Sequence, residues 1–199
     1  MEFVSIGPWC ITAELLIKNN LRLKAYPFDY IFSSLEIVKH CINDKFNIFL
    51  DKSYYYNNGS NDTSTRHSLY CKMLDTDILY KHHIKNGYPT SYKVSSGNLF
   101  NHHNMFIDGN YAKFKRRCER LIDLINSDNK IAFVYHNSYT DNFDDIIDFQ
   151  TAFSNNKNIY IVGIFENRNE KKILYESSNC KIYQNYNHAD IFNEINLMA

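Results

Sequence analysis

The sequence predicts an α/β fold, a Rossmann-like three-layer domain built on a mostly parallel sheet. Several short segments are apolar almost without interruption, which is typical of strands buried on both faces. Amphipathic helical segments separate these strands, as expected of crossovers that cover both faces of a parallel sheet. The chain has 199 residues, of which 44% are hydrophobic and 16% aromatic, enough for one compact core. We therefore expect a single domain over residues 1–199.

The first part of the chain predicts a strand, a tight turn and two helices. Residues 3–6 form a short apolar run that stops at Gly7-Pro8, and apolar side chains recur at helical spacing over 10–18. A Ser-x-x-Glu capping box at 33–36 then opens a second helix of about four turns, which reaches Phe49.

Residues 51–96 lose this regularity and consist of a Tyr- and Asn-rich run followed by short mixed pieces. Long irregular connections inside compact domains are usually functional lids, insertions or disordered segments. We expect an insertion or lid here, part of which packs through its aromatic side chains.

The remaining half of the chain is more regular, and strand and helix patterns alternate in it. The expected elements are a strand end at 98–102, helices at 111–126 and 144–153, strands at 130–135 and 159–165, a short helix at 169–176, a strand at 181–183 and a helix at 191–197.

Composition excludes several classes of function. The 22 basic and 22 acidic residues give a formal net charge of zero, which argues against nucleic acid or a membrane surface as partner. No apolar run spans a membrane and the start lacks a secretory signal, so we expect a cytoplasmic protein, in the host cytoplasm if it is viral. The five widely spaced cysteines favour a reducing compartment over a disulfide framework. Composition leaves the oligomeric state open.

The candidate site follows from the residues just after each predicted strand. In open parallel sheets, ligands bind beyond the carboxyl ends of the strands. The residues at those positions are Gly7 to Cys10, His102 to Asn104, His136 with Asn137, and Glu166 with Asn167. One edge of the sheet therefore receives a cysteine and several histidines.

Cys10 is the strongest candidate for a catalytic residue in this set. At the start of a helix, backbone N–H groups and the helix dipole stabilise a thiolate and lower the thiol pKa from about 8.5. The same amides, from Trp9 to Ile11, are placed to line an oxyanion hole. The competing interpretation is that Cys10 only packs between helix and sheet, because cysteine is among the most buried residue types.

A nucleophilic cysteine needs a base within hydrogen-bond reach and a group that orients the base. His103, beside His102, is the first candidate and His136 the second. The orienting groups considered are Asp108, Asn137 and Asp141. For each histidine, the competing interpretation is that it is an ordinary surface residue. Asn137, Gly7 and Trp9 are also candidate ligand-binding residues.

Metal and cofactor signals are weak in this sequence. The histidines and cysteines at 67, 71, 82, 83, 102 and 103 match no standard zinc spacing. The chain has neither a G-x-G-x-x-G motif nor a Walker loop. We expect no metal site and no cofactor.

A basic run lies opposite the apolar stripe of the helix at 111–126, and its residues are Lys113, Lys115, Arg116, Arg117 and Arg120. Such a run is usually a solvated face. The alternative is that Arg116 or Arg117 binds the phosphates of a sugar nucleotide, because a guanidinium offers a bidentate fork to such groups. Glu119 and Asp123 dilute the patch and argue against nucleic-acid binding.

Two blocks near the start, FVSIGPWC at 3–10 and YPFDYIFSSL at 26–35, resemble an uncharacterised family described as putative papain-like cysteine peptidases, found in bacteria and large DNA viruses. Residues 100–103 and the basic helix with Arg116-Arg117 are also similar, so the resemblance spans most of the first 120 residues. It implies Cys10 as the nucleophile, a histidine from His102-His103, and Asp29 as a site or turn residue.

The leading hypothesis is a cysteine-dependent hydrolase or acyl transferase that acts on an amide, isopeptide or ester of a small molecule or peptide. Cys10 attacks, and His103 accepts and returns the proton. The alternatives are a Rossmann-like transferase that uses a sugar nucleotide, with Cys10 structural, and a non-catalytic interaction module.

Overall fold

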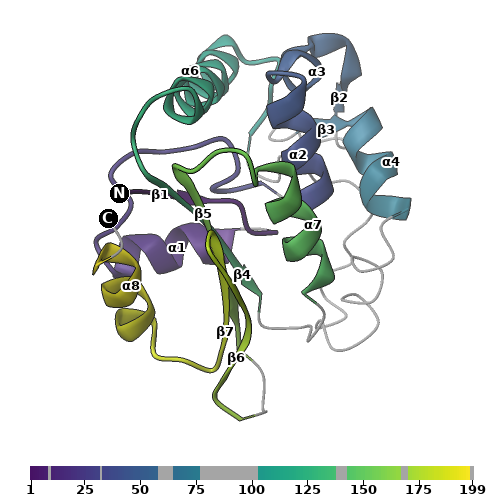
Figure 1. Ribbon diagram of the computed structural model, residues 1–199. Coiled ribbons are helices and arrows are strands. Elements are labelled where there is room, and N and C mark those ends of the chain that lie inside the picture. The colour runs from purple at the N-terminus through teal and green to yellow at the C-terminus, as the bar shows by residue number, and fades with distance from the viewer. Residues whose placement is uncertain are drawn as a thin grey trace.

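The computed structural model of the protein is shown in Figure 1. It describes residues 1–8, 10–31, 33–57, 65–76, 103–137, 143–166 and 170–197, with the backbone alone for 74–76. The strand end expected at 98–102 lies outside the described residues.

A five-stranded sheet forms the centre of the fold, in the order β1-β4-β5-β7-β6. The strands are β1 (Glu2–Ser5), β4 (Ile131–Asn137), β5 (Ile159–Phe165), β7 (Cys180–Gln184) and β6 (Lys172–Ser177). The first four are parallel to their neighbours, and β6 runs antiparallel to β7. The predicted α/β fold with a mostly parallel sheet is therefore confirmed. The parallel strands lie in chain order, β1-β4-β5-β7, without the reversal of a doubly wound sheet, so the Rossmann-like part is not established.

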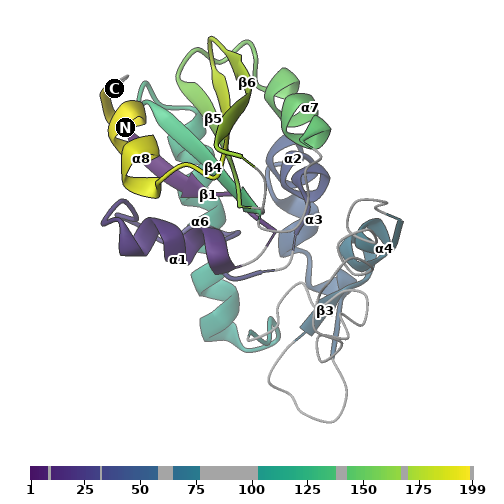
Figure 2. The same ribbon diagram turned by 90° about the horizontal axis from the view of Figure 1, so that it is seen from below.

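Helices cover both faces of this sheet (Figures 1 and 2). One face packs against α1 (Cys10–Lys18) and α8 (His188–Leu197), and the other against α2 (Leu35–Asn43), α6 (Asp108–Ile125) and α7 (Asp144–Ala152). Alternate residues of β4 enter the two cores: Val134 packs on the side of α1 and α8, and Phe133 on the side of α2, α6 and α7. This two-sided burial is why the strands are apolar almost without interruption.

The expected four-turn helix after the capping box is interrupted. It consists of α2 and a single turn, α3 (Asn47–Leu50), because Lys45 and Phe46 take left-handed φ angles of 57° and 61°. The N-cap is Ser34, whose hydroxyl accepts the N–H of Ile37 at 3.3 Å. Ser33 is not the cap, since its hydroxyl donates to the carbonyl of Gly7.

The short helix expected at 169–176 is wrong, because residues 172–177 form the edge strand β6. The segment pairs with β7 along its length, with an irregularity between Ile173 and Tyr175. Ile173 packs against one core, and Leu174 and Tyr175 pack against the other. Pairing with a neighbouring strand outweighs the weak helical spacing of so short a segment.

Part of the predicted insertion at 51–96 is regular. It contains the 3-10 turn η1 (Lys52–Tyr54), strands β2 (Tyr55–Asn57) and β3 (Thr65–His67) in an antiparallel pair, and α4 (Ser68–Thr76). Tyr55 and Tyr70 are buried in the main core, as expected from the aromatic content. Residues 77–96 lie outside the described residues, and the role of a lid stays a prediction.

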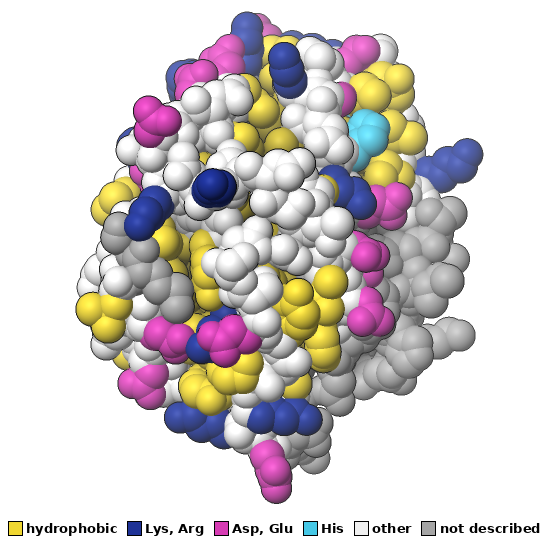
Figure 3. Space-filling view, viewed as in Figure 1, with side chains coloured by type: hydrophobic (Ala, Val, Ile, Leu, Met, Phe, Trp, Pro, Cys, Tyr) yellow, Lys and Arg dark blue, Asp and Glu magenta, His cyan; other side chains and the backbone are white. Residues whose placement is uncertain are grey.

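The other predicted elements are confirmed to within a few residues, namely β1, α1, α6, β4, α7, β5, β7 and α8. Among the described residues, no helix is both long and apolar enough to cross a membrane. The visible face in Figure 3 intersperses acidic and basic side chains, as the balanced composition leads us to expect.

Candidate active site

The carboxyl ends of four parallel strands meet at one edge of the sheet. Cys10 begins α1 after β1, and His136 and Asn137 end β4. Glu166 follows β5, and His188 begins α8 after β7. Residues that are far apart in the sequence therefore come to the same edge, as predicted for Cys10 and His136.

The turn that leads into α1 depends on Gly7. A Cβ at this position would overlap the side chain of Thr12 in the first turns of α1. The hydroxyl of Thr12 in turn accepts the backbone N–H of His136 at 3.3 Å, which joins α1 to the end of β4. Gly7 was predicted to contact a ligand, and the structure gives it this packing role.

A second contact fixes the same turn from the other side. The backbone N–H of Ser33 donates to the carbonyl of Pro8 at 3.1 Å, and its hydroxyl donates to the carbonyl of Gly7 at 3.4 Å. The two sequence blocks at 3–10 and 26–35 are therefore in direct contact. Together they hold Cys10 at the end of β1.

Cys10 is the cysteine that the fold leaves partly exposed, while Cys41, Cys71, Cys118 and Cys180 are buried. Partial burial raises the pKa of the Cys10 thiol, and Glu14, one helical turn later, raises it further by its charge and by a hydrogen bond from the thiol. The predicted lowering of this pKa is wrong, because burial and the nearby carboxylate outweigh the helix terminus. Among the described residues, Glu14 is the side chain that shifts the pKa of the Cys10 thiol.

The predicted base, His103, lies in different surroundings. Its ring packs edge-on against Phe114 of α6, with 5.2 Å between the ring centroids. Its carbonyl accepts hydrogen bonds from the N–H and hydroxyl of Thr65. Phe114 belongs to the core on the side of α2, α6 and α7, whereas α1 packs on the opposite face of the sheet. Trp9 and His102 lie outside the described residues.

The second predicted base, His136, lies in a cluster with Glu166 and His188. Its Nε2 is 3.2 Å from Oε2 of Glu166, and Nε2 of His188 is 2.8 Å from the other carboxylate oxygen. Burial and the neighbouring His188 lower the pKa of His136, and the charge of Glu166 opposes them. Asn137, also buried, donates from Nδ2 to the hydroxyl of Tyr135 at 3.2 Å.

Asp29 acts as a turn residue. Its buried carboxylate accepts the backbone N–H of Tyr26 at 2.9 Å and two hydrogen bonds from Arg22, at 2.9 and 2.6 Å. Burial raises the pKa of Asp29, and the charge of Arg22 opposes that rise. Of the two roles that the resemblance implies for Asp29, the contacts support the turn.

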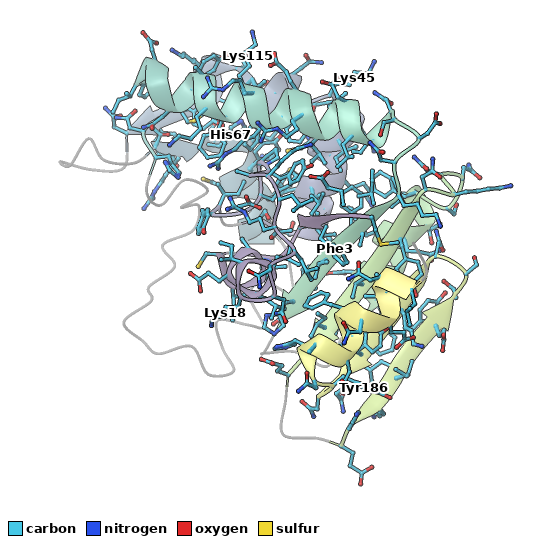
Figure 4. The ribbon with its side chains drawn as sticks, turned by 90° about the vertical axis from the view of Figure 1, so that its left-hand side faces the viewer. Phe3, Lys18, Lys45, His67, Lys115 and Tyr186 are labelled. Atoms are coloured by element: carbon cyan, nitrogen blue, oxygen red, sulfur yellow. The ribbon has the colours of Figure 1, made fainter. Side chains whose placement is uncertain are left out.

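The basic run of α6 has two kinds of environment. Arg117 lies over the ring of Phe114 at 5.3 Å, and its pKa is lowered by burial while the charge of Asp29 opposes the change. Lys115 points away from the sheet on the outer side of α6 (Figure 4). Arg116 is exposed and borders an open pocket of about 540 Å³.

That pocket also has Lys24, Arg120, Glu119, Asp123, Ser127 and Asn129 in its lining. Ser127 and Asn129 directly precede β4, so the pocket lies toward the amino end of this strand, away from the edge with Cys10. Its two acidic residues offset two of its three basic ones, which argues against a phosphate site.

The prediction from sequence missed Glu14 and His188 as site residues. Glu14 belongs to the same helix face as Cys10, four residues later, and this spacing could have identified it. His188 comes four residues after the end of β7, the last parallel strand. Its position after β7 is the signal that could have found it.

Comparison with known proteins agrees with the sequence blocks around Cys10. No curated protein and no solved structure matches the chain significantly. The family model described as putative papain-like cysteine peptidase matches residues 1–162, which include β1, α1, β4 and most of β5. This match covers well over half of the chain and contains Cys10, Glu14 and His136. The chain therefore belongs to the putative papain-like cysteine peptidase family.

Proposed function

We infer that this chain is a cysteine-dependent hydrolase or acyl transferase acting on an amide, isopeptide or ester, with Cys10 as the nucleophile. One observation carries the proposal. Cys10 is partly exposed at the start of α1, on the edge of the sheet where α/β proteins bind ligands, whereas the four other cysteines are buried. Membership of the papain-like family supports the same chemistry.

Glu14 is the proton acceptor that we assign to the thiol. The thiol already donates to this carboxylate, which raises the thiol pKa, so Cys10 is protonated at rest near neutral pH. In this proposal the proton passes to Glu14 as the sulfur attacks the acyl carbon, because this carboxylate already contacts the thiol. Glu14 then gives that proton to the departing amine or alcohol, and a thioester on Cys10 remains.

Hydrolysis of the thioester reverses the proton transfers. Glu14 accepts a proton from the attacking water and returns it to the sulfur of Cys10 as the acid product leaves. In an acyl transferase, an amine or alcohol takes the place of this water. Both routes regenerate the thiol, and neither needs an external oxidant or reductant.

The first turn of α1 supports the negative charge that develops on the acyl oxygen. The first backbone N–H groups of a helix have no acceptor within the helix. Those of Cys10 and Ile11 open α1 and are next to the attacking sulfur in the chain. Donors fixed in this way stabilise an oxyanion without reorganisation.

Hydrolysis of an activated ester, p-nitrophenyl acetate, tests the proposal. We expect Cys10→Ala to lose all activity above background. Glu14→Gln should lower kcat/KM by at least about tenfold, because it removes the proton acceptor. Glu36→Gln removes an exposed carboxylate near the start of α2 and should leave the rate unchanged.

The same assay separates the possible bases. His103→Ala and His136→Gln should retain most of the activity if Glu14 accepts the proton. Loss of activity in His103→Ala with full activity in Glu14→Gln would move the base to His103. Full activity in Cys10→Ala would refute the nucleophile itself.

A further inference from the structure

Three metal-ligating side chains lie together at the carboxyl edge of the sheet, outside the pair formed by Cys10 and Glu14. His136 is the penultimate residue of β4, Glu166 follows β5, and His188 begins α8 after β7. The strands β4, β5 and β7 are consecutive neighbours in the sheet. The fold thus places each of these residues at the end of the next strand.

Their ligand atoms lie close enough together to reach one metal ion after small movements. One nitrogen or oxygen from each residue lies within 4.8 Å of the other two. Oε2 of Glu166 is 3.2 Å from Nε2 of His136, and Oε1 of Glu166 is 2.8 Å from Nε2 of His188. Two ligand atoms about 2.1 Å from one metal, at a tetrahedral angle, are roughly 3.4 Å apart. Small side-chain adjustments would bring all three atoms to one ion.

Contacts with Glu166 satisfy the ring nitrogens of the cluster only in part. His136 is only 3% exposed, and its Nδ1 has no hydrogen-bond partner among the described residues. Its Nε2 faces Oε2 of Glu166 at 3.2 Å. Nε2 of His188 lies 2.8 Å from Oε1 of Glu166, without the angles of a hydrogen bond. A buried polar atom without a partner is destabilising. An ion held between the rings and the carboxylate would bind one nitrogen of each ring.

We propose that His136, Glu166 and His188 bind one divalent transition-metal ion, such as Zn²⁺, at the carboxyl edge of the sheet. Two imidazoles and one carboxylate are the donors that suit zinc and its first-row neighbours, whereas Mg²⁺ and Ca²⁺ prefer oxygen ligands alone. Three protein ligands leave a coordination position for water or for an oxygen of the substrate.

The buried imidazole is suited to this role. A histidine binds a metal through a neutral ring nitrogen. The ring of His136 is enclosed by the sheet, and its backbone N–H is held by Thr12. Its position is therefore fixed by the fold, while Glu166 and His188 close the site from the solvent side, with side chains 43% and 28% exposed.

Zinc binding to the full chain tests the proposal. The chain is stripped with a chelator and dialysed against Zn²⁺, and bound metal is measured by mass spectrometry. We expect one tightly bound Zn²⁺ per chain. Glu166→Gln and His188→Gln, at partly exposed positions, should each weaken binding by at least about tenfold. Glu170→Gln removes an exposed carboxylate outside the cluster and should bind zinc as the wild type does.

Cobalt gives a second readout that identifies the ligands. Co²⁺ bound by nitrogen and oxygen shows visible ligand-field bands without the near-ultraviolet charge transfer that a thiolate ligand adds. Circular dichroism confirms that the variants are folded. Absence of stoichiometric zinc in the wild type would refute the site. A zinc affinity in Glu166→Gln and His188→Gln equal to that of the wild type would also refute it.

The proposal of a metal site and the proposal of Cys10 as nucleophile can be refuted independently of each other. Cys10→Ala should bind zinc with unchanged affinity, because none of the three ligands is a cysteine. A zinc affinity that falls in Cys10→Ala, together with a thiolate band in the cobalt spectrum, would contradict the assigned ligand set. Loss of ester hydrolysis in Cys10→Ala does not bear on the metal.

Discussion

At the scale of single residues, Gly7 decides how closely α1 approaches the end of β1. A Cβ at Gly7 would overlap Thr12, whose hydroxyl binds the backbone of His136. We expect Gly7→Ala to lower the free energy of unfolding by about 1 to 3 kcal/mol, because the added methyl group forces α1 away from the strand. Urea denaturation measures this loss.

Gly109 provides a matched control for this change. It lies in the first turn of α6, and a Cβ there would meet nothing within 4 Å. Gly109→Ala should leave stability unchanged or raise it by up to about 1 kcal/mol, because alanine restricts the unfolded chain. Equal losses in the two variants would contradict the close contact between Gly7 and Thr12.

The pair of Cys10 and Glu14 predicts an unusual pH dependence for alkylation. Burial and Glu14 raise the thiol pKa, so the rate of reaction of Cys10 with iodoacetamide should reach half its maximum above the ordinary cysteine value of about 8.5. Glu14→Gln removes the carboxylate and should shift this midpoint downward. Peptide mass spectrometry follows each cysteine separately, and an unchanged midpoint in Glu14→Gln would contradict the contact.

At the scale of elements, His67 joins the small sheet of β2 and β3 to its neighbours. Its Nε2 lies 3.1 Å from the carbonyl of Ile48 in α3, and its Nδ1 accepts the N–H of Tyr70 in α4 at 3.2 Å. Its ring stacks on Tyr54 and Tyr70. Burial lowers the pKa of His67 from 6.5 to about 4.

This depressed pKa links the packing of His67 to acid stability. The unfolded chain binds a proton at His67 between about pH 6.5 and 4, and the folded chain does not. The stabilisation is complete above pH 6.5 and is lost as the pH falls toward 4, up to about 3 kcal/mol. The slope of unfolding free energy against pH in this range should be smaller in His67→Gln. Equal slopes in the wild type and His67→Gln would refute the role of His67 in acid stability. The other buried histidine with a lowered pKa, His136, is present in both proteins and contributes equally to their slopes.

The elements also show where local sequence patterns suffice. Residues 159–165 are continuously apolar, and β5 has these bounds because it lies between β4 and β7 and is covered on both faces. The pattern at 169–176 misled because β6 is an edge strand, whose conformation is set by pairing with β7. The break between α2 and α3 depends on the left-handed residues Lys45 and Phe46, and neither residue type signals such a conformation.

At the scale of the whole molecule, residues beyond the family match complete the fold. The match ends at residue 162, inside β5, whereas β7 pairs with β5 and α8 covers the face that also holds α1. A chain ending at Glu166 would expose the edge of β5 and the apolar face that Ile191 and Ile195 cover. We expect this truncated chain to lose cooperative urea unfolding. A cooperative transition with the midpoint of the full chain would contradict this role.

The candidate site could be predicted only in part, because it depends on contacts between segments that are far apart in the sequence. The position of Cys10 and His136 after strands follows from local patterns and from the geometry of parallel sheets. The thiol pKa depends on burial and on Glu14, and the position of Cys10 after a strand reveals neither effect. The contacts of His136 with Glu166 and His188 depend on which strands are neighbours, and strand order is not visible in local periodicity.

Capture of the acyl intermediate tests the central claim most directly. The full chain is mixed with p-nitrophenyl acetate, quenched in acid and digested, and the acetylated residue is located by peptide mass spectrometry. We expect a transient acetyl group on Cys10 that hydroxylamine removes, with none on the four buried cysteines. An acetyl group confined to another residue, or equal ester turnover in Cys10→Ala, would contradict Cys10 as the nucleophile.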